Sequence, residues 1–271
     1  MTHRKGAVRI ADIPPEILES LNRGEIETAN LPEWLAVDQL KVAENVLPSL
    51  GMEAALPKLK EVVAELAKKT QPKVLDAIGT ALAQRVSYSS GKRSLYQKIA
   101  THQADSVRSW AAYLLRDDEA LTFFELLEAV KPLAADSHFG VREVAWMALR
   151  GHIATHLSEA ITILTGWAND TEANVRRFAS EATRPCGVWT PHIPSLKQNP
   201  GQAASVLEPL RSDVSKYVRD SVGNWLNDAS KTTPEWVKAV CTRWETESKT
   251  AETVYIIKKA MRTIRKTDGG K

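Results

Sequence analysis

Three acidic residues of this chain are each followed or preceded closely by a tryptophan, and arginines lie nearby. The pairs are Glu143 with Trp146, Glu181 with Trp189, and Asp228 with Trp225. A carboxylate and an indole together suit an electron-poor ring or an oxocarbenium-like sugar, because both groups stabilise positive charge. The plainer interpretation of each acid is a salt bridge to a neighbouring arginine, and that of each tryptophan is a place in the core.

These acids lie in a repeated pattern that must position them. A Val-Arg pair followed by a small or apolar residue four positions after the valine recurs at Val107, Val141, Val175 and Val218, which are 34, 34 and 43 residues apart. Apolar residues recur at helical spacing almost everywhere, and no run of five or more residues alternates as a strand would. The pattern predicts an all-α fold, an α-solenoid of HEAT-like helical repeats.

Counting from each valine as position zero divides these helices into two faces. Positions 0, +4 and +8 form a buried stripe, which reads Val107, Ala111, Leu115 and then Val141, Ala145, Leu149. Positions +2, +5, +6 and +9 lie on the other face, which we expect to line the concave side of the solenoid. The arginine at position +1 of every repeat is expected to pair with an acid between neighbouring repeats.

Arginine occupies position +9 in three successive repeats, which predicts a basic groove. A row of guanidinium groups suits a regularly charged polyanion such as the DNA backbone. The alternative is that each arginine binds the carbonyl groups at the end of its own helix. The predicted DNA-binding residues, with the three tryptophans added as stacking surfaces, are Arg116, Arg150, Arg177, Arg184, Trp146, Trp189 and Trp225.

Composition excludes several other classes of protein. The net charge is +3 and 43% of the 271 residues are hydrophobic, but no stretch approaches the roughly 18 apolar residues of a membrane helix. Cys186 and Cys241 have no partners at metal-ligand spacing, and no GxSxG, HExxH or P-loop pattern occurs. We expect no metal and no organic cofactor, and a cytoplasmic protein that associates with the nucleoid when acting. Residues 1–271 are expected to form a single domain, with an N-terminal extension at 1–20 and a flexible tail at 266–271.

Four segments resemble bacterial DNA alkylation repair proteins of the AlkC type, which are relatives of AlkD among the HEAT-like-repeat DNA glycosylases. The segments are LNRGEIETANLPEWLAVDQLKVAENVLPSL, FGVREVAWMALR, VRRFASEATRPCGVW and LEPLRSDVSKYVRDSVGNWLNDASKTTPEWV. The resemblance runs in order, without a large gap, from about Leu21 to Arg265. The chain departs from the resemblance at Cys186, where a basic residue is usual. It is also not expected to carry the immunoglobulin-like C-terminal domain of some relatives.

The resemblance implies removal of alkylated bases, with 3-methyladenine and 3-methylcytosine as the substrate class. The family's catalytic acids, matched by motif, fall on Glu143, Glu181 and Asp228. Alkylation at ring N3 makes a base cationic and a good leaving group, so the enzyme needs a carboxylate near C1′ more than a general acid. No lysine occurs at positions +2, +5, +6 or +9 of the repeats, which favours a monofunctional glycosylase with no lyase step. The partner is then double-stranded DNA containing alkylated bases, bound by a monomer.

Two other functions fit the same residues. A non-catalytic HEAT-repeat protein that binds distorted or branched DNA would keep the arginines and use the acids structurally. A protein scaffold, the commonest role of α-solenoids, would bind independently of DNA and of salt.

Among the three acids, Glu143 and Asp228 are favoured as catalytic, because Arg177 and Arg184 lie at ion-pairing distance along the helix from Glu181.

Overall fold

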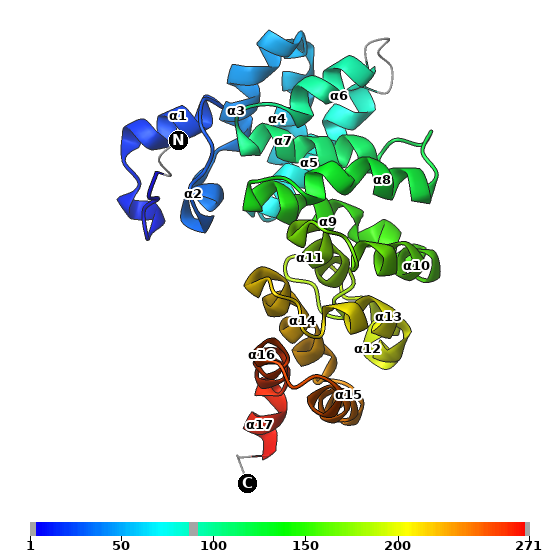
Figure 1. Ribbon diagram of the computed structural model, residues 1–271. Coiled ribbons are helices and arrows are strands. Elements are labelled where there is room, and N and C mark those ends of the chain that lie inside the picture. The colour runs from blue at the N-terminus through cyan, green and yellow to red at the C-terminus, as the bar shows by residue number, and fades with distance from the viewer. Residues whose placement is uncertain (1–3, 87–91, 269–271) are drawn as a thin grey trace. The chain divides into compact units, whose positions relative to one another are not determined.

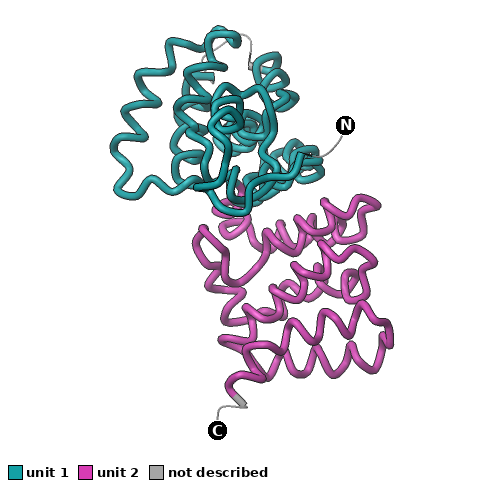
Figure 2. Tube along the Cα trace, turned by 90° about the vertical axis from the view of Figure 1, so that its left-hand side faces the viewer, with its two compact units in different colours: residues 1–148 teal, residues 149–271 magenta. Residues whose placement is uncertain are grey.

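The computed structural model describes residues 4–86 and 92–268, which form helices joined by turns and contain no strand (Figure 1). The prediction of an all-α chain is confirmed. The chain divides into two compact units, Met1–Ala148 and Leu149–Lys271, which Figure 2 colours separately. Within the described residues, no helix has both the length and the apolar character needed to cross a membrane.

Unit 1 contains the first eight α-helices and the start of the ninth. They are α1 (Pro15–Asn22), α2 (Leu31–Ala36), α3 (Gln39–Val46), α4 (Leu56–Ala64), α5 (Gln71–Val86), α6 (Lys92–Ala100), α7 (Asp105–Arg116), α8 (Phe123–Ala134) and α9 (Phe139–Thr155). Three short 3-10 helices are η1 (Ile10–Asp12), η2 (Leu47–Leu50) and η3 (Glu53–Ala55). Within this unit α7 packs against α5 and α6.

Unit 2 contains the remainder of α9 and the helices that follow. They are α10 (Leu157–Trp167), α11 (Ala173–Ala182), α12 (Pro194–Gln198), α13 (Ala204–Leu207), α14 (Lys216–Ala229), α15 (Pro234–Glu247), α16 (Ala251–Ala260) and α17 (Arg262–Asp268). The 3-10 helices η4 (Pro200–Ala203) and η5 (Glu208–Leu210) flank α13. Here α14 packs against α11 on one side and α16 on the other, so the Val-Arg helices of successive repeats lie next to one another.

The arginine of each Val-Arg pair forms hydrogen bonds to the backbone of the turn that precedes its own helix. In every repeat its Nη1 atom donates to two carbonyl oxygens, five and six residues earlier, and the four arginines are Arg108, Arg142, Arg176 and Arg219. Arg108 Nε also donates to Asp136 at 2.9 Å, and Arg176 Nε to Asp213 at 2.6 Å. Each of these acids lies just before the next Val-Arg helix. The predicted pairing between neighbouring repeats is therefore confirmed for these two arginines.

The buried stripe is confirmed, whereas the opposite face is not the open surface that the register predicts. Val107, Ala111 and Leu115 are buried. However, Ser109, Ala112 and Tyr113 on the other face of α7 are buried as well, and the same holds for Trp146 and Met147 in α9. Within unit 1, a Cβ atom on Gly79 of α5 would lie 2.5 Å from Tyr113, so the two helices approach closely. Positions +2, +5 and +6 therefore serve largely as packing surface for an adjacent helix.

The two ends of the chain are more ordered than the sequence suggests. Arg4 forms a 2.6 Å salt bridge with Glu33 of α2, and Asn30, the N-cap residue of α2, donates to the Ala7 carbonyl, so the predicted extension packs on α2. At the other end, residues 266–268 are helical in α17, and the rest of the predicted tail, residues 269–271, lies outside the described residues. The single domain stays a prediction.

Candidate active site

The predicted acids Glu181 and Asp228 meet at one arginine in unit 2. Arg184, two residues after the end of α11, donates through Nη1 to Glu181 Oε1 at 2.6 Å. Its Nη2 and Nε atoms donate to Asp228 Oδ2 of α14 at 2.6 and 2.9 Å. The Arg184 guanidinium thus bridges two carboxylates from neighbouring repeats. Its contribution to binding a phosphate stays a prediction.

The Glu181 carboxylate is buried among partners from its own repeat and the next. Its side chain is buried, Arg177 Nη2 lies 3.5 Å from Oε2, and the Ser221 hydroxyl donates to the same oxygen at 2.7 Å. Burial by itself would raise the pKa of Glu181, but the positive charges of Arg177 and Arg184 together with the Ser221 hydrogen bond outweigh it and lower the pKa. Glu181 is therefore ionised at neutral pH, and its negative charge is already neutralised by arginines.

Asp228 differs because it borders a hollow of about 540 Å³. The residues around this hollow are Arg184, Cys186, Gly187, Val188, His192, Lys197, Asp228, Lys231 and Thr232. Lys231 donates to Asp228 Oδ1 at 2.7 Å, and its side chain is 48% exposed. Asp228 is the carboxylate of the hollow, and Arg184, Lys197 and Lys231 surround it with positive charge. This is the arrangement that a substrate with a cationic base and an anionic backbone requires.

The repeat positions selected from the sequence did not include the lysines of this hollow. Lys231 follows Asp228 by three residues, just beyond the C-terminus of α14, and Lys197 belongs to the separate helix α12. The i, i+3 spacing of Asp228 and Lys231 is a signal that could have found the first of them.

Arg150 does not extend from an open groove, so the sequence-based placement of this residue is wrong. Its side chain is buried, with 2% of the residue exposed. It donates to the carbonyl oxygens of Ala182 at 2.7 Å, of Pro191 at 3.3 Å and of Arg184. Burial, together with the nearby Arg184 charge, lowers the pKa of Arg150 to about 10, which leaves it protonated at neutral pH. Arg150 therefore closes the C-terminal end of α11, the helix of the next repeat.

Two other predicted DNA contacts also have protein partners. In unit 1, Arg116 donates to Asp76 at 2.5 Å and to Asp117 at 2.7 Å. In unit 2, Arg177 stacks over the Tyr217 ring, with 3.9 Å between the guanidinium carbon and the ring centroid. Ion-paired arginines can still face a phosphate, so both assignments stay predictions.

The three tryptophans occupy different environments. Trp225 is fully buried, its indole N–H donates to Thr183 Oγ1 at 3.2 Å, and its ring packs against Trp236. Trp146 is also buried, and its indole N–H donates to Glu143 Oε2 at 3.0 Å. The half-buried Glu143 is thereby fixed by the aromatic residue that the sequence paired with it.

Only Trp189 among these three is substantially exposed, at 51%. It lies in the loop of residues 183–193, next to Val188, which borders the hollow. Its φ of 63° falls in the left-handed region that residues other than glycine rarely adopt. Strained backbone of this kind is concentrated at binding and catalytic sites. Trp189 is therefore the best placed of the three for stacking on a base.

The sequence model of a family described as "DNA alkylation repair enzyme" matches residues 55–264. The chain belongs to this family. Among solved structures of similar fold is a Pseudomonas fluorescens alkylpurine DNA glycosylase, AlkC, bound to DNA containing an abasic site analog. It is 24% identical with a TM-score of 0.67, and the match covers 83% of this chain and 61% of that chain. AlkD2 from Streptococcus mutans is 25% identical with a TM-score of 0.59, covering 78% of this chain and 97% of that chain.

A relative from Bacillus subtilis, the uncharacterized protein YhaZ, is 37% identical over 139 residues. That match covers 51% of this chain and 38% of YhaZ, so the chain spans well under half of that relative. The likeness to AlkC and AlkD2 confirms that this member of the DNA alkylation repair family has the HEAT-like repeat fold.

Proposed function

We propose that the chain is a DNA glycosylase that hydrolyses the N-glycosidic bond of cationic alkylated bases such as 3-methyladenine and 3-methylcytosine. The observation that carries this proposal is the position of Asp228 at a hollow otherwise charged by Arg184, Lys197 and Lys231, in a chain of the DNA alkylation repair family. A hollow of this composition favours a substrate that is positive at the reacting centre and negative around it. Alkylated DNA has this charge distribution.

In the proposed reaction the bond between C1′ and the ring nitrogen breaks, and its electron pair leaves with the base, which becomes neutral. Positive charge develops at C1′, where a carboxylate stabilises it in a setting largely shielded from water. A water then adds to C1′, and the carboxylate accepts the proton that the water loses. The products are the free base and an abasic site. No amine nucleophile takes part in this scheme.

The other charged groups of the hollow have a role in the same scheme. Lys231 is half exposed and Lys197 belongs to a different helix, so both can bind phosphate oxygens on either side of the damaged nucleotide. When Lys231 moves to a phosphate, Asp228 keeps its bonds to Arg184 and one of its oxygens becomes available. The exposed Trp189 ring, in the loop that borders the hollow, offers a surface on which a base can stack.

Glu143, in unit 1, is the other carboxylate that we propose as a candidate for the chemistry. Its side chain is half-buried, and the indole N–H of Trp146 donates to its Oε2 atom at 3.0 Å. Both oxygens of Glu181 and of Asp228 have partners, but Lys231, the partner of Asp228 Oδ1, is 48% exposed, whereas the arginine partners of Glu181 are at most 15% exposed. Glu181 is the weaker candidate for this reason. The order among the acids is therefore Asp228 and Glu143 before Glu181.

One observation favours a second function, the binding of distorted DNA without base excision. Arg184 already neutralises both Glu181 and Asp228, as it would in a purely structural network. Incubation of the chain with methylated duplex DNA separates the two functions, because a glycosylase releases free base and leaves abasic sites. A binder alone retains the duplex but releases no base. Quantifying 3-methyladenine, 3-methylcytosine and 7-methylguanine separately also identifies the substrate class.

A further inference from the structure

A short C-terminal segment contains an excess of positive charge greater than that of the whole chain. Residues 258–266 read KKAMRTIRK and include five cationic residues and no acid. Because the net charge of the chain is +3, the remaining residues together have a net charge of −2. None of these residues lies at the repeat positions from which the DNA-binding residues were predicted. A run of cations of this density is itself a signal for nucleic-acid binding.

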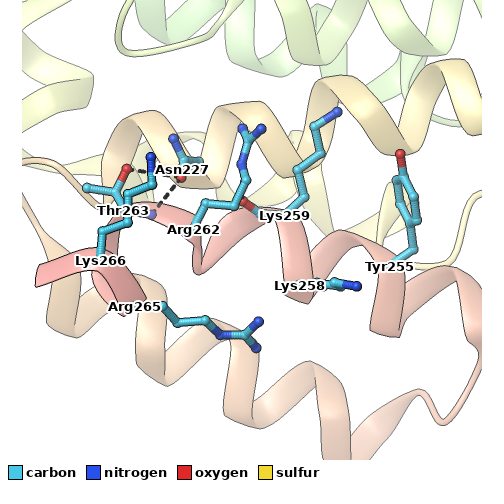
Figure 3. A pocket seen from close by; sticks show the side chains of 8 residues that line it. All are labelled: Asn227, Tyr255, Lys258, Lys259, Arg262, Thr263, Arg265 and Lys266. Carbon is cyan, nitrogen blue, oxygen red and sulfur yellow. Dashed lines mark hydrogen bonds between the residues drawn. The ribbon is translucent and has the colours of Figure 1, made fainter. Parts of the chain in front are cut away.

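The structure gathers these cations around one hollow of about 690 Å³ on unit 2 (Figure 3). We call the five side chains the basic patch: Lys258, Lys259, Arg262, Arg265 and Lys266. Figure 3 shows Lys259 and Arg262 extending from α16 and α17 toward α14, with Asn227 of α14 beside them. The Asn227 side-chain oxygen accepts from the Thr263 backbone N–H and hydroxyl, both at 3.1 Å, which fixes the start of α17 against α14.

Most of this charge has no acidic partner. Lys259 forms a 2.5 Å ion pair with Asp220, and Arg262 donates to the neutral Asn224 side chain at 2.9 Å. Among the side chains that the structure describes, Lys258, Arg262, Arg265 and Lys266 have no carboxylate within salt-bridge distance. This contrasts with the arginines of the repeats, where Arg108, Arg116, Arg176 and Arg184 each bind at least one carboxylate.

Helix stability does not account for the whole patch. Lys258 and Lys259 lie in the last turn of α16, and Arg265 and Lys266 in the last turn of α17, where cations interact favourably with the helix dipole. Arg262 is the first residue of α17, where a positive charge is unfavourable by about 0.3–1 kcal/mol. A terminal repeat needs a polar outer surface for solubility, but that surface does not need charges of one sign only. An anionic ligand explains both the sign and the unpaired state.

We infer that the basic patch binds the phosphodiester backbone of duplex DNA and supplies affinity that does not depend on a lesion. The choice of DNA as the ligand rests on the proposed function. The patch and the candidate active site share α14, because Asn227 borders the patch and Asp228 borders the other hollow. A helix with its side chains is about 10–12 Å wide. The two hollows therefore lie close enough together for one duplex to contact both.

The salt dependence of binding to an undamaged duplex tests this inference. The test variant is Lys258→Gln, Arg262→Gln, Arg265→Gln and Lys266→Gln combined. The matched control removes the same four charges from exposed positions of unit 1, as Lys41→Gln, Lys68→Gln, Lys69→Gln and Lys73→Gln. Each lost phosphate contact lowers the log-log salt slope by about 0.9, which corresponds to about fivefold in affinity at 0.15 M salt. Two to four contacts therefore predict a loss of about 30- to 900-fold.

The expected result is a slope smaller by about 1.8–3.6 in the patch variant and an unchanged slope in the control, with both variants melting like wild type. An unchanged slope in the patch variant overturns the inference, and so does an equal loss in the control, which would reflect net charge alone. A loss confined to duplex RNA, with DNA binding intact, also overturns it. This equilibrium measurement on undamaged DNA involves no base release. Absence of glycosylase activity would therefore refute the proposed function without changing the salt slope.

Discussion

Replacing Arg150 by methionine should destabilise unit 2 without changing its contacts with DNA. The substitution keeps the apolar stem and removes the guanidinium, so the carbonyl oxygens of Ala182, Arg184 and Pro191 lose their donor. A hydrogen bond to a charged group contributes about 1.5–3 kcal/mol, and a buried polar group left unpaired costs about 1–3 kcal/mol. The guanidinium is itself poorly solvated, as its pKa of about 10 indicates, and its removal offsets part of the loss.

The net expectation is a loss of about 3–5 kcal/mol in the free energy of unfolding, because three carbonyl oxygens lose a charged donor while the cost of burying the guanidinium disappears. In a protein of this size each kcal/mol shifts the Tm by about 2–4 °C, so Arg150→Met should melt about 6–20 °C below wild type. Calorimetry or circular dichroism measures the shift. Below the melting transition, titration with undamaged duplex DNA should give the wild-type salt slope.

Arg262→Ala is the matched control, because it removes an exposed guanidinium from the same unit. We expect its unfolding free energy to stay within about 0.5 kcal/mol of wild type. Its salt slope should fall by about 0.9 if Arg262 binds one phosphate. An Arg150→Met protein that melts like wild type and loses about 0.9 of the salt slope would refute this reasoning. It would return Arg150 to the DNA-binding surface.

Three further substitutions have definite expected outcomes. Trp225→Ala should cost about 3–5 kcal/mol in unfolding free energy, because the ring is fully buried; a variant as stable as wild type in urea would contradict its core placement. Trp189→Ala should melt like wild type yet lose about 1–3 kcal/mol of affinity for single-stranded or damaged DNA, and unchanged affinity would exclude stacking. Glu181 has a pKa below its usual value of 4.5, so its contribution to stability is present above about pH 4.5 and disappears as the pH falls through the lowered value. The stability gap between wild type and Glu181→Gln should therefore close on acidification from pH 7 to 3, and a gap independent of pH would rule out the ion pairs as its cause.

The repeat architecture was predictable because one contact recurs in each of the four Val-Arg repeats. The arginine of each Val-Arg pair must reach the carbonyl groups of the preceding turn, so both residues reappear at a regular spacing. The accessibility of the opposite face was not predictable from helical period. Position +6 is Tyr113 in one repeat and Glu181 in another, and both are buried because a helix from another repeat packs on them. Only the stacking of repeats, a long-range property, decides this.

The site was predictable where partners are close in sequence. The sequence spacing of Arg177, Glu181 and Arg184, in and just after α11, indicated the ion pairs that the structure contains. The meeting of Asp228 with Arg184 joins residues 44 positions apart, so only the packing of α11 on α14 could establish it. Trp189 and Trp225 look alike in sequence, yet one is exposed on a loop and the other fills the core.

Single-turnover release of base from duplex DNA containing 3-methyladenine or 3-methylcytosine tests the proposed activity most directly. With protein in excess, wild type should release free base and leave abasic sites. Asp228→Asn keeps the shape of the side chain and removes its charge, so it should lower the rate by about 10²-fold or more and leave DNA affinity equal or higher. Glu143→Gln should show the same separation of rate from affinity. Binding of the damaged duplex by wild type without base release, or amide variants that both react within threefold of wild type, would contradict the proposed glycosylase.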